Sequence, residues 1–124
     1  MHSHAATRQA GDVAIIDLSG GITIAGGIGL LRNTIQQLVA GGHRNVLVNL
    51  KELIYVDSAG MGELVGACTT VRNLGGDMKL VNPQARVTHL LHMTKLSTLF
   101  AVFADEQTAL QSFPDSAPRP QVMP

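Results

Sequence analysis

The stretch "LIYVDSAGMGELV", residues 53–65, decides the fold and raises the first question about function. An apolar run typical of a strand ends at Asp57 and Ser58, and an apolar pattern typical of a helix follows directly. Both residue types are good helix N-caps, so the strand is predicted to pass straight into the helix. This helix nevertheless contains three glycines, each about 1 kcal/mol worse than alanine in a helix: Gly60, Gly62 and Gly66.

Two physical reasons could keep glycines in this helix. The helix could pack so tightly on its own sheet that no side chain fits. Alternatively, a partner could bring its own surface close to the backbone around Ser58. The sequence leaves both explanations open.

The rest of the chain alternates between patterns typical of strands and of helices. Strands are predicted at 5–9, 13–18, 45–50, 78–81 and 99–103. Four helices are predicted. The first has apolar residues at Ile28, Leu31, Ile35 and Leu38 and ends at Gly41–Gly42, and the second follows Asp57 and ends at Gly75–Gly76. The third starts at Asn82–Pro83, and the fourth runs from Asp105 to Phe113.

This alternation predicts a single α/β domain, a mixed central sheet surrounded by about four helices. A turn at Gly11–Asp12 would pair the first two strands as an N-terminal hairpin. We expect a flexible N-terminus over 1–4, the domain over 5–113 and a disordered, proline-rich tail over 114–124. Ligands and partners of such sheets meet the carboxyl ends of strands, which is where Ser58 lies.

Composition excludes several classes of function. Nine basic residues balance nine acidic ones and aromatic residues make up only 3%, so nucleic-acid binding is disfavoured. No stretch approaches the length of a membrane span, and the first residues lack an apolar signal-peptide core, so we expect a cytoplasmic protein without membrane insertion. The single cysteine, Cys68, is interpreted as a small buried apolar residue.

No enzyme signature is complete. A nucleophile elbow would need glycine where Val56 stands, and His89 and His92 have no obvious acidic partner for a catalytic triad. The histidines are not spaced as metal ligands. The glycines of "GGITIAGGIGLL", residues 20–31, match neither the phosphate loop nor the dinucleotide fingerprint. The chain is therefore predicted to be no enzyme and to need no cofactor or metal.

Ser58 is well placed to carry a phosphate, because a helix N-terminus stabilises added negative charge. Asp57 opposes this effect by placing a second negative charge beside it. Phosphorylation would then leave the fold intact but make this surface strongly anionic, so that a partner covering Ser58 would be repelled. The alternative interpretation is that the Asp-Ser pair only caps the helix.

The stretch "VDSAGMGELV", residues 56–65, resembles the D-S-x-G-[LM]-G signature of the STAS domain, which is found in anti-sigma factor antagonists. The flanking segments are also similar to that family, in the same order and covering about residues 5–113. The motif segments lie at 13–22, 44–60, 71–83 and 90–110.

The resemblance implies that phosphorylation controls the binding of a partner. The unphosphorylated chain would bind an anti-sigma factor that is itself an ATP-dependent serine kinase, and so release the sigma factor. Phosphorylation of Ser58 would break the complex, and a serine/threonine phosphatase would restore it. The resemblance places partner contacts at Thr23, Asp57, Ser58, Ala59, Gly60, Met61 and Gly62.

One loop departs from the family pattern. The family often has G-E-[LI]-D after the first core strand, whereas this chain has "GGIT", residues 20–23, with Thr23 in place of the aspartate. We expect Thr23 to cap the following helix instead. Two rival functions stay open: a STAS subunit of a larger signalling or lipid-transport assembly that ignores phosphorylation, and a nucleotide-binding domain that uses the glycine-rich loop. The oligomeric state is not predicted.

Overall fold

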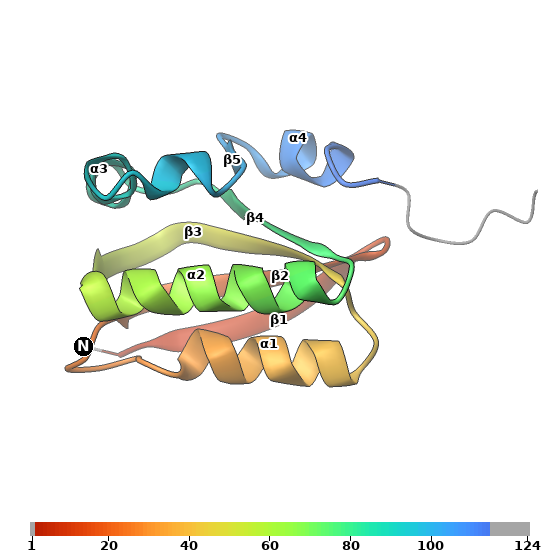
Figure 1. The fold of residues 1–124 in the computed structure, drawn as a ribbon, viewed down its shortest axis with the longest axis horizontal. Coiled ribbons are helices and arrows are strands. Elements are labelled where there is room, and N and C mark those ends of the chain that lie inside the picture. Colours follow the sequence, from red (N-terminus) through yellow and green to blue (C-terminus); the bar gives the residue numbers. More distant parts are fainter. Residues whose placement is uncertain (1, 115–124) are drawn as a thin grey trace, which may run out of the picture.

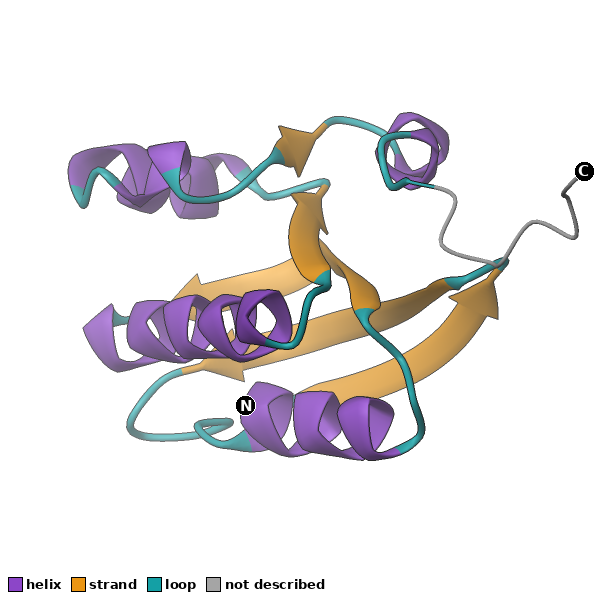
Figure 2. Ribbon diagram, turned by 45° about the vertical axis from the view of Figure 1, so that its right-hand side comes forward, coloured by secondary structure: helices purple, strands orange, loops and turns teal. Residues whose placement is uncertain are grey.

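The computed structural model describes residues 2–114, which form one five-stranded sheet flanked by helices (Figures 1 and 2). In chain order the elements are β1 (His4–Ala10), β2 (Val13–Ile22), α1 (Leu30–Ala40), β3 (Asn45–Val56), α2 (Ser58–Asn73), β4 (Asp77–Val81), α3 (Ala85–Met93), the 3-10 turn η1 (Leu96–Thr98), β5 (Val102–Phe103) and α4 (Glu106–Gln111). The predicted tail lies outside the described residues except for Pro114.

The sheet is mixed, as predicted. Its strand order is β1-β2-β3-β4-β5. The first pair is an antiparallel hairpin that turns at Gly11–Asp12, and the three following pairs are parallel. The fold class and the N-terminal hairpin derived from the sequence are therefore confirmed.

Two apolar layers hold the sheet. Because the parallel strands follow one another in chain order, right-handed crossovers place α1, α2 and α3 on the same face. The larger core lies there and includes residues from all three helices, such as Leu31, Leu64 and Val87. A smaller core on the opposite face packs α4 against the sheet through Ala109 and Phe113. Ser58, the first residue of α2, therefore lies on the face of the sheet that α1, α2 and α3 cover.

Several element boundaries differ from the sequence prediction. The hairpin begins at His4, one residue before the expected start of the domain, and β3 joins the predicted strand 45–50 and the apolar run before Asp57 into one strand that ends at Val56. The last strand is only Val102–Phe103, because the 3-10 turn ends just before it and Phe100 is buried in the larger core.

The start of α3 was wrong in the sequence prediction. Asn82 is not an N-cap: it has φ of +57°, and its N–H donates to the carbonyl of Phe103 at 2.9 Å. This hydrogen bond holds the backbone beside β5 for one more residue, and asparagine tolerates the left-handed conformation. The helix begins later, at Ala85, with Gln84 at the N-cap position.

Candidate functional site

Ser58 begins α2 at the carboxyl end of β3, and its side chain is exposed. The N-cap is the preceding residue, Asp57, whose carboxylate accepts from the N–H of Gly60 at 2.9 Å. Within residues 2–114, the Ser58 hydroxyl forms no hydrogen bond. The two residues of the pair therefore have separate roles: Asp57 caps the helix and leaves the Ser58 hydroxyl free for chemistry.

The Asp57 carboxylate also holds the loop between β2 and α1. Its second oxygen accepts from the N–H of Ile24 at 2.9 Å. The hydrogen bonds from Ile24 and Gly60 lower the pKa of Asp57, so this carboxylate is anionic at neutral pH. Ile24 itself is 75% exposed, which places a large apolar side chain in the loop that Asp57 anchors beside Ser58.

Thr23 does not cap α1, contrary to expectation. Its hydroxyl and backbone close a tight turn with Gly26, in which the two N–H groups donate across the turn at 2.9 and 3.0 Å. The N-cap position of α1 is Gly29, which has no side chain to offer. The N-terminus of α1 therefore needs a partner from elsewhere in the fold.

Glu63 of α2 supplies that partner. Its two carboxylate oxygens accept from the N–H of Gly29 at 2.6 Å and from the N–H of Arg32 at 3.0 Å. A carboxylate is favourable there because the N-terminus of a helix carries partial positive charge. Together, Asp57 and Glu63 tie both ends of the β2–α1 loop to α2. Sequence reasoning missed Glu63; its only signal was an acidic residue with no basic residue one turn later.

Tight packing explains one glycine of α2 and not the others. A Cβ on Gly60 would lie 1.9 Å from the carbonyl oxygen of Ile22, so only glycine lets the helix approach β2 this closely. A Cβ on Gly62 or Gly66 would meet nothing within 4 Å. Tight packing therefore accounts for Gly60 and does not account for Gly62 or Gly66.

The predicted contact residues divide between surface and interior. Gly60 is buried, and Met61 is only 3% exposed within the larger core, so neither lies on the surface of this fold. Their burial follows from the helical period, which turns both toward the sheet. The other five reach the surface near the start of α2, and Ile24, which sequence reasoning did not select, joins them: Thr23, Asp57, Ser58, Ala59 and Gly62.

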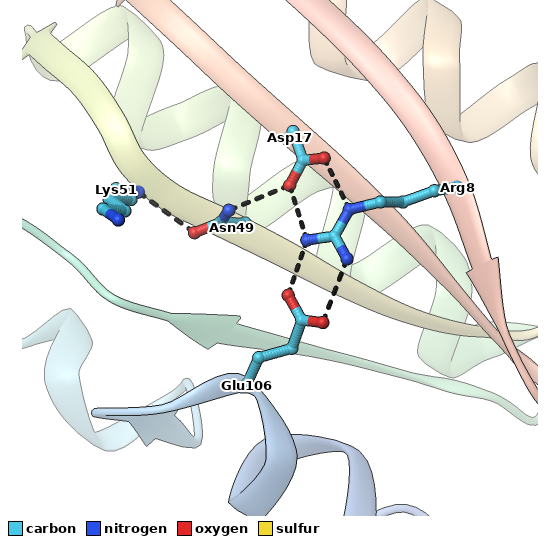
Figure 3. Close-up of polar contacts among 5 residues, drawn as sticks. All are labelled: Arg8, Asp17, Asn49, Lys51 and Glu106. Carbon is cyan, nitrogen blue, oxygen red and sulfur yellow. Dashed lines mark hydrogen bonds and ion pairs between the residues drawn. The ribbon is translucent and has the colours of Figure 1, made fainter.

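A second polar cluster lies on the other face of the sheet, away from these residues. The Arg8 guanidinium of β1 pairs with Asp17 of β2 at 2.7 Å and with Glu106 of α4 at 3.0 Å (Figure 3). Asn49 donates to Asp17 at 2.8 Å. Hydrogen bonds from Arg8 lower the pKa of both carboxyl groups. This cluster binds α4 to the hairpin, which is a structural role.

Among residues 2–114 there is neither a hydrogen-bonded pair of Ser58 with a histidine nor a cluster of metal-ligand side chains. No histidine donates to or accepts from Ser58 anywhere in residues 2–114. Over the same part of the chain, no three His, Cys, Asp or Glu side chains gather where they could bind a metal ion. None of the described helices combines the length and apolarity that crossing a membrane requires.

Comparison with known proteins identifies the family. The profile of the STAS domain matches residues 4–109. The anti-sigma-B factor antagonist of Bacillus subtilis strain 168 is 30% identical over 82 residues, which cover 66% of this chain and 74% of the relative. A match over most of the chain, together with this relative, shows that the chain belongs to the STAS domain family.

Solved structures share the fold at lower sequence identity. An anti-sigma factor antagonist from Mycobacterium paratuberculosis superposes with a TM-score of 0.79 at 18% identity, covering 90% of this chain and 94% of that one. SpoIIAA in its unphosphorylated form gives a TM-score of 0.64 at 19% identity, covering 87% and 96%. The phosphorylated form of SpoIIAA, from Bacillus, gives 0.67 at the same identity, covering 87% and 97%.

Proposed function

We propose that this STAS domain is a cytoplasmic anti-sigma factor antagonist. In its unphosphorylated form it binds an anti-sigma factor that is a serine kinase, and this binding releases the sigma factor. The names of its relatives support this function. The chain acts by binding and by being modified, and ATP belongs to the kinase.

Phosphorylation of Ser58 switches the antagonist off in this proposal. The observation that carries it is the division of roles at the start of α2: Asp57 caps the helix, and the exposed Ser58 hydroxyl forms no hydrogen bond with any other described residue. A phosphate there would be tolerated by the helix N-terminus but would add to the charge of Asp57. A partner covering Ser58 would then be repelled, until a serine/threonine phosphatase removes the group.

The partner surface in this proposal consists of the surface residues around Ser58. Ile24 offers the apolar contact, since it is 75% exposed and is held in place by Asp57. The loop lacks the acidic residue that the family often has there. The remaining contacts are Thr23, Asp57, Ser58, Ala59 and Gly62.

The experiment compares Ser58→Ala and Ser58→Glu chains as baits in lysate of the native cells, followed by mass spectrometry and by binding to the purified partner. Thr69→Glu is the matched control, because it adds the same charge on an exposed position of α2. We expect the Ala and control baits to retain a kinase-type anti-sigma factor and the Glu bait to lose it. With ATP, the purified kinase should phosphorylate the wild-type chain but not Ser58→Ala.

Equal retention of the same partners by the Ala and Glu baits would contradict the switch. It would instead favour a STAS subunit of a larger assembly. Unfolding of Ser58→Ala would show that the serine is needed as a cap after all.

A further inference from the structure

We propose that the groove between α1 and α2 is a second docking site for the anti-sigma factor, distinct from the Ser58 surface. Its occupant is an amphipathic helix of that partner, which inserts an apolar side chain and pairs a carboxylate with Arg32. This inference rests on the proposed function.

The groove is apolar and of the size of a binding pocket. It encloses about 450 Å³, within the range of ligand pockets in proteins. Ile28 and Ile35 line it from the side of α1, and Ile28 is 41% exposed. From the side of α2 it is lined by Ala59, which is the residue after Ser58, and by residues further along the helix. The groove thus runs directly from the proposed phosphorylation site.

The fold does not need the two glycines that open this groove. Gly62 and Gly66 lie in its lining, and a Cβ at either position would meet nothing within 4 Å. Both are in the middle of a helix, where glycine is disfavoured. Small residues let the backbones of two helices approach closely, so a partner helix could lie along α2 at these positions.

The free charge at the groove is positive. The Arg32 side chain lines it, and no carboxylate lies within ion-pair distance of this guanidinium in residues 2–114. Glu63 also lines the groove, but both of its oxygens accept hydrogen bonds from backbone N–H groups of the α1 start. The groove therefore selects an apolar partner that carries an acidic side chain at its edge.

The same features favour a protein helix over a small molecule. Small-molecule sites are also mostly apolar, but they contain a few precisely placed polar groups that together fix the orientation of the ligand. Here the Glu63 carboxylate already accepts hydrogen bonds from the start of α1. Among the described residues that line the groove between α1 and α2, only the Arg32 guanidinium remains as an unpaired charge, at its edge. An amphipathic helix matches this arrangement, because its apolar face fills a groove while its charged residues stay at the rim.

The test measures the affinity of the purified anti-sigma kinase for groove variants by isothermal titration calorimetry. Gly66→Leu fills the groove, and Arg32→Glu reverses its charge. The matched controls are Gln107→Leu, on an exposed position of α4 across the sheet, and Lys95→Glu, an exposed charge outside the groove. We expect each groove variant to bind at least about tenfold more weakly, and each control to stay within about twofold of wild type.

Stability measurements keep the test decisive. Because the Gly66 position is open and helical, the Tm of Gly66→Leu should not fall, so its lost affinity cannot come from unfolding. Wild-type affinity in both groove variants, with Ser58→Glu still weakened, would overturn the groove and leave the switch standing. If the unphosphorylated wild-type chain bound no anti-sigma factor, both proposals would be overturned.

Discussion

On the inner face of α2, a Cβ on Gly60 would meet the backbone of β2, whereas on the outer face a Cβ on Gly66 would meet nothing within 4 Å. These two glycines of the helix therefore lie in different surroundings. The inner glycine lets the helix pack on its own sheet. The outer glycine does nothing for packing and keeps a groove open beside Ser58. The fold requires glycine at position 60, whereas glycine at position 66 shapes only the surface.

The strongest test of this comparison replaces each glycine by alanine. Gly60→Ala places a Cβ against a backbone oxygen of β2 that cannot move aside cheaply, so we expect a loss of about 3 kcal/mol or more in the free energy of unfolding. Gly66→Ala is the matched control and should gain up to about 1 kcal/mol through helix propensity. Urea unfolding followed by circular dichroism measures both. A similar loss in the two variants would show that the outer face is packed as well.

Glu63 extends the comparison to the side of α2 that faces α1. Glu63→Gln replaces a carboxylate oxygen by an amide donor opposite a backbone N–H, so we expect a loss of about 1.5 kcal/mol. The local effect is sharper: hydrogen exchange should accelerate at the N–H groups of Gly29 and Arg32. Gln36→Glu, exposed on α1, is a control that leaves these bonds intact. Unchanged exchange at both amides would mean that α1 does not depend on this cap.

The Arg8 cluster, on the far face of the sheet, gives the smallest expected effect. Its three charged side chains are between about a third and a half exposed, so Arg8→Ala should cost about 1 kcal/mol or less at pH 7. The variant should leave phosphorylation of Ser58 unchanged, because the cluster lies away from α2.

The pH dependence of that small effect follows from the pKa directions. In the folded chain the pKa values of Asp17 and Glu106 are lowered by Arg8, so their contribution is present above the ordinary carboxyl pKa values of about 4 and is lost as the pH falls through the lowered ones. The stability difference between wild type and Arg8→Ala should therefore shrink as the pH falls below about 4. Urea unfolding across this range measures it. A difference that stays constant with pH would show that the arginine acts through packing alone.

The order of strands and helices, the hairpin and the position of Ser58 where a strand passes into a helix could all be predicted from the sequence. These features depend on local patterns: apolar periodicity, turn glycines and capping residues act over a few neighbouring positions. The same local reasoning could name both Asp57 and Ser58 as caps, but could not divide the roles between them. It also placed Asn82 at a helix start, because a local motif does not reveal pairing with a strand twenty residues away.

Which of these residues are buried and which reach the surface depends on how the elements pack against one another. Met61 is buried because α2 lies on the sheet by that side, and Gly60 is required because the carbonyl of Ile22 lies against it. Glu63 caps α1 from another helix, a bond between residues more than thirty positions apart. Such contacts depend on the distances between packed elements. The sequence shows which side chains are present but not how far apart they lie in the fold. Their roles follow from those distances.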